Sequence, residues 1–214
     1  MSKEYGYIGK EVTQAFRDNK GIFTPQDIIE LDQENKWTNF GQLELIQTQS
    51  YSGTVSTVDF TSIQEDVYDV HFMTFSQMSG ATDNVATMDL RFYENGVVET
   101  ANYQVARQNA GLNPSVGFNE SKSTSADRIP NLFGSGTGTG ENDGGYAYFY
   151  NLGDSTKYSF CTFHTVGLTN EAYFASAFGS GVLPQTSQVD GIQVKVTSGN
   201  YNDFLVSLYG VRFT

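Results

Sequence analysis

Residues 67–78 read VYDVHFMTFSQM, and this stretch decides the fold class because its side chains alternate with the period of a β-strand. Phe72 and Thr74 share one face of the predicted strand. The positions between and after them, Met73 and Phe75, point to the other face. Strict alternation over this length predicts a half-buried strand rather than a helix.

Strand-like patterns continue along the chain on both sides of this stretch. Residues 94–96 are Glu-Asn-Gly, and Asn-Gly between two β-rich runs is the strongest short signal for a hairpin turn. Further strands are predicted at 42–50, 54–60, 85–93, 97–105, 145–150, 157–166, 171–179, 189–197 and 204–212. About ten strands separated by turn residues predict an all-β fold, an antiparallel β-sandwich or jelly roll.

Composition supports a β-rich domain and excludes several functions. The 214 residues include 14% aromatic side chains and 22 Gly, but only 4 Pro. Asp and Glu number 24 against 12 Lys and Arg, so the net charge is -12. Such a chain repels phosphate backbones and anionic lipid, and we expect neither nucleic-acid binding nor membrane insertion. A lone cysteine, Cys161, rules out an internal disulfide, and we expect a soluble protein made in a reducing cytoplasm.

The first forty residues differ from the rest and carry five of the twelve basic residues. Thr24 suits a helix N-cap and Pro25 suits the first helical position, which predicts one short helix at about residues 25–35. The helical pattern gives way to the strand pattern near residue 41. We therefore expect an N-terminal docking segment, 1–41, and a β-sandwich domain, 42–214.

Four apolar residues of the N-terminal segment are candidates for contact with a partner. They are Phe23, Ile28, Ile29 and Trp37. One interpretation is that they dock the chain onto a larger assembly. The other is that they close the end of their own sandwich, and an apolar patch serves either use equally well.

Two polar stretches, 109–125 and 134–145, are predicted to be long exposed loops. The second reads GSGTGTGENDGG, but its glycines do not fit the spacing of a phosphate-binding loop and no Gly-Lys-Ser/Thr follows. Glu141 and Asp143 have oxygens that suit calcium, yet a solvated turn is the favoured interpretation. We therefore predict no cofactor and no metal.

The sequence also argues against catalysis. His71 and His164 are the only histidines, so a zinc site with several histidines is excluded. Cys161 and His164 differ by three positions, which places them on opposite faces of a strand. We predict no catalytic residues and no enzyme. The alternative is a pair of carboxylates that converge in the fold and cleave a glycosidic bond.

The most informative aromatic cluster is residues 146–150, which read YAYFY. Tyr146, Tyr148 and Tyr150 share one face of the predicted strand, and Phe149 lies on the other. The tyrosine side is interpreted first as ordinary packing or a subunit contact. The functional alternative is a surface that stacks on sugar rings, with Tyr148 and Tyr150 as the candidate glycan-binding residues.

Several segments, in order, resemble a family of virion structural proteins of tailed phages that infect marine bacteria and cyanobacteria. Residues 46–68 resemble its opening strand and Asp-Phe-Thr turn, and 82–85 (TDNV) resemble the turn before its next strand. Residues 151–158 (NLGDSTKY) are similar to its Thr-Lys-Tyr turn, although Leu-Gly replaces the family's proline. Residues 192–200 and 206–210 (VSLYG) resemble its closing hairpin.

A separate segment, 20–37, resembles a short element of phage tail-fibre and appendage proteins that leads through a helix to a tryptophan. Together the resemblances span about residues 20–214. They imply a non-enzymatic structural protein located in the virion, on a tail fibre, on the baseplate or as a capsid decoration.

The partners implied are other virion proteins, together with further copies of the chain in a closed homo-oligomer such as a trimer. The alternative function is a carbohydrate-binding module that recognises a host surface glycan. Tyr148, Tyr150 and the 134–145 loop would contact that glycan.

Overall fold

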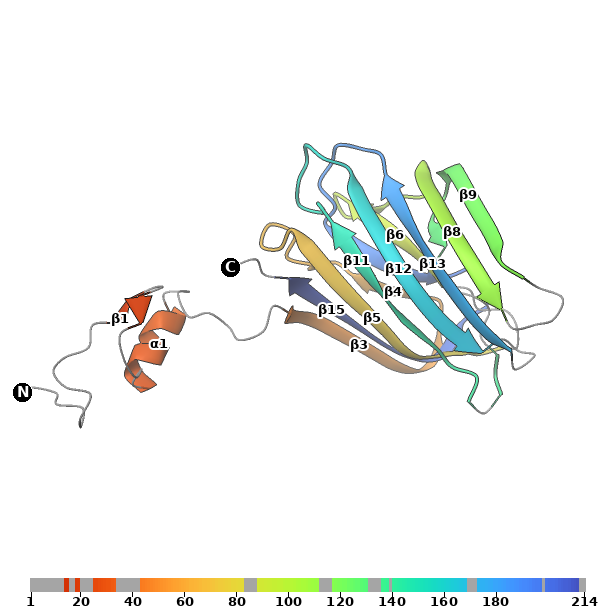
Figure 1. The fold of residues 1–214 in the computed structure, drawn as a ribbon, viewed down its shortest axis with the longest axis horizontal. Coiled ribbons are helices and arrows are strands. Elements are labelled where there is room, and N and C mark those ends of the chain that lie inside the picture. The colour runs from red at the N-terminus through yellow and green to blue at the C-terminus, as the bar shows by residue number, and fades with distance from the viewer. Residues whose placement is uncertain are drawn as a thin grey trace, which may run out of the picture. The chain divides into compact units, whose positions relative to one another are not determined.

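The protein is almost entirely β-structure, built from antiparallel sheets, as the strand pattern predicts. The computed structural model describes residues 14–15, 18–19, 25–33, 43–82, 88–111, 117–130, 136–138, 140–168, 173–197 and 199–211. By its internal contacts the chain divides into two compact units, one of residues 1–42 with Thr214 and one of Leu43–Phe213 (Figure 1).

The N-terminal unit contains the helix expected from the sequence. Helix α1, Pro25–Gln33, begins at the proline, where the missing N–H costs no hydrogen bond. The side chain of Gln26 donates to Glu30 one turn later, at 2.9 Å. Two short strands, β1 (Gln14–Ala15) and β2 (Asp18–Asn19), pair antiparallel ahead of the helix.

The second unit is a sandwich of two antiparallel sheets, and Figure 1 views the larger sheet face-on with the smaller sheet behind it. In spatial order the larger sheet contains β3 (Leu43–Val55), β15 (Tyr201–Val211), β5 (Val70–Gly80), β11 (Asp143–Tyr150), β12 (Ser159–Leu168), β13 (Phe174–Leu183), β8 (Tyr103–Gly111) and β9 (Asn119–Ala126). The smaller sheet contains β10 (Ile129–Pro130), β6 (Met88–Glu94), β14 (Gly191–Val196) and β4 (Thr57–Phe60), with β7 (Val97–Val98) paired to β6.

The core lies between the two sheets and is formed by the inward positions of both. Phe149 on β11 and Phe92 on β6 are fully buried, and their rings meet edge to face with centroids 6.0 Å apart. Met73 and Phe75 on β5 lie in the same cluster as Ile192 on β14. The alternation that predicted Met73 and Phe75 on the opposite face from Phe72 is therefore confirmed.

The predicted Asn-Gly hairpin is present, but its return strand is shorter than expected. Asn95 and Gly96 have φ angles of 52° and 72°, the left-handed conformation that a tight hairpin turn needs. Strand β7 ends at Val98, and the chain then crosses to the other sheet. Tyr103 begins β8 there with its ring fully buried, and its hydroxyl accepts a hydrogen bond from the backbone N–H of Phe92. One strand over 97–105 was thus a wrong prediction.

The prediction of a long loop at 109–125 is also wrong in part. Strand β8 continues to Gly111, and β9 pairs with it along the outer edge of the larger sheet. The sequence of β9, NESKSTSA, is polar on both faces because an edge strand at the end of a sheet buries little of either face. Residues 112–116, between the two strands, lie outside the described residues.

Candidate functional site

Aromatic side chains gather on the outer face of the larger sheet, and ring contacts connect seven of them into a network. We use the name aromatic face for the surface formed by these outward side chains, which are Phe72, Tyr146, Tyr148, Tyr150, Phe160, His164, Phe178 and Tyr209. They lie on five neighbouring strands, β15, β5, β11, β12 and β13. Each alternates with a buried residue on its strand, which places it on the side away from the core.

Phe72 is the centre of one half of this network. Its ring centroid lies 4.7 Å from that of Tyr148, 6.1 Å from that of Tyr146 and 6.1 Å from that of Tyr209. Tyr148 also stacks on Tyr150, with centroids 6.5 Å apart. Aromatic rings at these separations stabilise one another.

The other half of the network extends through His164. Its ring meets Tyr146 edge to face at 6.0 Å and Phe178 edge to face at 6.4 Å. The imidazole Nε2 lies 3.0 Å from the hydroxyl oxygen of Ser176. The histidine is therefore held in place by both an aromatic and a polar contact.

The aromatic face is uncharged in a strongly acidic protein. On the described parts of strands β5, β11, β12, β13 and β8, no outward-facing residue is Asp, Glu, Lys or Arg. The residues at these positions are aromatic, aliphatic, hydroxyl or amide. Because the whole chain has a net charge of -12, the charge is concentrated on other surfaces.

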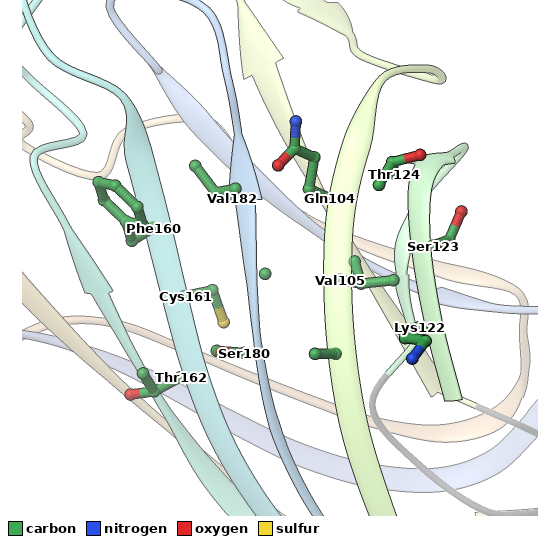
Figure 2. Close-up of a pocket in the computed structure, with 12 residues that line it drawn as sticks. Gln104, Val105, Lys122, Ser123, Thr124, Phe160, Cys161, Thr162, Ser180 and Val182 are labelled. Atoms are coloured by element: carbon green, nitrogen blue, oxygen red, sulfur yellow. The ribbon is translucent and has the colours of Figure 1, made fainter. Parts of the chain in front are cut away.

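A groove, which we call the trough, crosses the strands at one end of this face (Figure 2). Its floor is a row of small side chains that lie opposite one another on adjacent strands: Thr162 on β12, Ser180 on β13 and Ala106 on β8. Lys122 on β9 continues the row at the sheet edge, and at the other end Thr162 is paired with Tyr148 on β11, whose large ring ends the row. Larger side chains on both sides make the row a depression.

The two rims of the trough each carry an exposed phenylalanine. Phe160, Val182 and Gln104 form one rim, and that side of the trough has a volume of about 760 Å³. Phe178 and Gln108 form the other, over a volume of about 470 Å³. Phe160 is 42% exposed and Phe178 is 48% exposed, so both rings are open to solvent.

Two glycines explain how β13 supports the trough. A Cβ at Gly181 would lie 2.7 Å from the side chain of Ile129 on the smaller sheet, so only glycine allows this close approach. A Cβ at Gly179 would lie 2.5 Å from the backbone oxygen of Ala106 on the neighbouring strand. The inner side of β13 therefore packs closely, while its outer side presents Phe178, Ser180 and Val182.

Several polar groups of the trough are available to a ligand. Within the part of the chain that the structure describes, the side chains of Gln104, Gln108 and Ser180 make no hydrogen bond. The hydroxyls of Thr162 and Tyr150 lie 3.4 Å apart, a long contact on the exposed surface. Amide and hydroxyl groups thus stand next to aromatic rings along the whole groove.

The structure places the predicted glycan-binding residues on this face. Tyr148 and Tyr150 share the outer side of β11 with Tyr146, and Phe149 is buried beneath them, as the alternation predicted. The predicted loop 134–145 does not line the trough where it is described. Glu141 in that loop accepts a hydrogen bond from the backbone N–H of Gly138 at 2.8 Å, which closes a local turn.

Most residues of the trough were not singled out by the sequence. Phe160 and Thr162 alternate with Cys161 and Phe163, and Phe178 and Ser180 alternate with glycine and alanine. These alternations were a usable signal, because each identifies an outward residue on its own strand. They do not say which outward residues become neighbours.

Cys161 and His164 lie on opposite faces of β12, as their spacing predicted. Cys161 is fully buried, and burial raises the pKa of its thiol, so little reactive thiolate is present at neutral pH. The other histidine, His71, is buried with its Nε2 2.8 Å from the backbone oxygen of Ile63, and burial lowers its pKa.

The predicted docking residues belong to the N-terminal unit. Ile28 and Ile29 lie on α1, and Ile29 is 49% exposed. Phe23 and Trp37 lie outside the described residues.

Two kinds of feature are absent among the described residues. There, no three His, Cys, Asp or Glu side chains gather closely enough to hold a metal ion. No helix in the same set has the length and hydropathy needed to cross a membrane. Comparison of the chain with protein-family models, with curated proteins and with solved structures finds no match.

Proposed function

We propose that this protein is a non-enzymatic structural module of a tailed-phage virion, which contacts its surroundings through the aromatic face. The N-terminal segment would dock the chain on the tail, the baseplate or the capsid surface. Other virion proteins and further copies of the chain are its proposed partners.

The virion location is supported by the sequence. Four segments between residues 46 and 210 resemble, in order, the strands and turns of one virion structural family, and residues 20–37 resemble a phage appendage element. The order of short motifs along a chain is more specific than any one of them.

The observation that carries the binding role is the uncharged, ring-lined aromatic face. Soluble monomers rarely expose large contiguous apolar patches, and a contiguous exposed aromatic patch marks a contact surface. The described nucleophile candidate, Cys161, is buried beneath this face, which favours binding over covalent catalysis.

Recognition of a host surface glycan is the second candidate function, and the trough favours it. Rings and free polar groups alternate along the trough, and sugars present both apolar ring faces and hydroxyls. The two functions are compatible, because a virion module can hold its place with one surface and bind with another.

Quantitative mass spectrometry of purified virions tests the proposal. We expect the protein to be present in virions of the phage that encodes it, at a fixed ratio to the major capsid protein. One copy per capsid subunit or capsomer indicates a head decoration, whereas small multiples of three or six indicate the tail, where rotational symmetry sets the count. Absence from purified virions, with abundant protein in infected cells, would contradict it.

A further inference from the structure

We propose that the trough binds a single chain of an uncharged polysaccharide, which lies across strands β12, β13 and β8. The inference rests on the proposed role of the aromatic face as a binding surface and names its ligand. It also moves the site away from the 134–145 loop.

The shape of the trough suits an extended polysaccharide chain. Its floor crosses the strands from Thr162 to Lys122, over four neighbouring strands. With strands about 4.8 Å apart, this row is about 14 Å long, which accommodates a few sugar rings. Figure 2 shows the groove bounded along one side by Phe160, Val182 and Gln104.

The side chains that line the trough favour a sugar over an apolar ligand. Phe160 and Phe178 stand on opposite rims, so a ring in the trough contacts an aromatic surface on either side. Between them the hydroxyls of Thr162 and Ser180 line the floor, and the amides of Gln104 and Gln108 extend from the rims. An apolar ligand would cover Ser180, Gln104 and Gln108 and leave their polar groups without partners.

The charge distribution selects a neutral polymer over an acidic one. Among the residues that the structure describes, three charged residues line the trough: Lys122 and Glu120, which lie at its β9 end and have opposite signs, and Arg107 on β8, whose Nε is buried. The rest of the protein is acidic, with a net charge of -12, and repels a polyanion as it approaches.

A second copy of the chain is the competing occupant of the aromatic face. Two sheets that pack face to face fill the space between them with interdigitated apolar side chains. The trough instead has small and polar side chains on its floor, so a second flat sheet would leave an empty channel there. The observations therefore favour a narrow polar chain.

Affinity electrophoresis in native gels tests the proposal directly. The acidic protein migrates through gels that contain mannan, laminarin, dextran or galactan, and through matched gels that contain the polyanion alginate. We expect at least one neutral polysaccharide to retard the protein, whereas alginate leaves its mobility unchanged.

Two variants locate the site. Phe178→Ala removes one rim ring, and we expect it to weaken binding roughly tenfold, as loss of an aromatic contact does. Ser180→Glu places a charge on the floor and should abolish retardation. Phe118→Ala is the matched control, because this phenylalanine is 82% exposed and does not line the trough. Circular dichroism and thermal denaturation verify that all three variants fold.

Three outcomes would overturn the proposal. They are no retardation by any neutral polysaccharide, retardation by alginate alone, or retardation that both trough variants leave unchanged. Sedimentation tests the competing occupant: a dimer that Phe178→Ala converts to a monomer would show that a second copy covers the face. Failure here is separate from failure of the virion role, because copy number in virions does not depend on glycan binding.

Discussion

The two outer faces of the sandwich differ in the polarity of their outward side chains and in how exposed those side chains are. On the larger sheet, outward side chains are aromatic or uncharged, and many remain open. On the smaller sheet the outward positions are charged or polar, and several are nevertheless buried: Asp89 is 2% exposed and Arg91 and Gln193 are each 8% exposed.

Side-chain hydrogen bonds account for the burial of these polar residues on the outer face of the smaller sheet, which we call the closed face. Asp59 accepts from Tyr93 at 2.7 Å and from Gln193 at 2.8 Å. Arg91 reaches Asp127 in the segment before β10, with one contact to its carboxylate at 2.9 Å and one to its backbone oxygen at 3.1 Å.

A similar set of contacts surrounds Asp89. Its carboxylate pairs with Arg128 at 3.2 Å and accepts a hydrogen bond from Thr197. Polar groups on the smaller face thus satisfy one another, whereas Gln104, Gln108 and Ser180 of the trough have no such partners among the described residues. The difference teaches that polar groups without protein partners beside aromatic rings, rather than polarity itself, distinguish the face that we propose binds a ligand.

The largest expected effect is a pH dependence of stability that Asp89 introduces on the closed face. Burial raises the pKa of Asp89 from 3.8 to about 6 despite its contacts with Thr197 and Arg128. The folded protein therefore holds this proton more tightly than the unfolded chain does. Asp89 consequently lowers the free energy of unfolding as pH rises from about 4 to about 6, by at most about 3 kcal/mol.

Urea denaturation of the wild type and of Asp89→Asn between pH 4 and pH 7 measures this effect. The Asn variant cannot ionise, so the stability of the wild type should fall relative to it as pH rises. Parallel curves for the two proteins would contradict the prediction. Lys122→Ala, on the open edge strand, is the control and should leave the pH profile unchanged.

Removal of a cation from the closed face should cost stability. Arg91→Ala deletes both hydrogen bonds to Asp127, and we expect a loss of about 2 kcal/mol, because bonds to charged groups are the stronger ones. Arg128 also contacts Asp127 at 2.9 Å, which limits the loss. Thermal and urea unfolding give the value, and a change below about 0.5 kcal/mol would show that the contact is only a surface pair.

How far the sequence predicts this molecule depends on whether a feature lies within one strand. Alternation within a strand assigns Tyr148 to the outer side and Phe149 to the core without any knowledge of the fold. It fails for β9, whose residues are polar on both sides, and for 97–105, where the chain changes sheet between two strand-like runs.

The trough lies beyond sequence reasoning for a different reason. Thr162, Ser180 and Ala106 come from three strands whose order is not their order in the chain, because β8 follows β13 in space. Each is an outward residue by alternation. Only the register of the sheet brings them into one row, and long-range pairing of this kind is not encoded locally.

A pair of tyrosines sharpens the contrast between the faces at smaller magnitude. Tyr93 on the smaller sheet donates its hydroxyl to Asp59, and burial together with this bond raises its pKa to about 12. Tyr93→Phe should therefore lower stability by about 1 kcal/mol. Tyr148→Phe, on the open face, is the matched change and should stay within about 0.5 kcal/mol. Equal losses in the two variants would remove the distinction.

The smallest expected effect is on the trough rim. Phe178→Ala shortens a half-exposed side chain, and we expect its free energy of unfolding to stay within about 0.5 kcal/mol of wild type. A loss of several kcal/mol, measured by urea denaturation, would place Phe178 in the packing of the fold. The aromatic face would then be a second core rather than a contact surface.

One pairing in the larger sheet bears on how the sandwich carries mechanical load. Strand β3, through which the chain enters the sandwich, lies beside β15, through which it leaves, and Leu43 is paired with Val211. A tension applied between these two neighbouring ends opens their ladder one hydrogen bond at a time. Leu43 also lies in one row across the sheet with Phe160 on the rim of the trough, through Val211, Val70 and Tyr150. A tension between Leu43 and a ligand in the trough therefore acts across the strands and opens the same ladder from its Leu43 end. A module tethered before residue 43 and held at the trough would give way first at the pairing of β3 with β15.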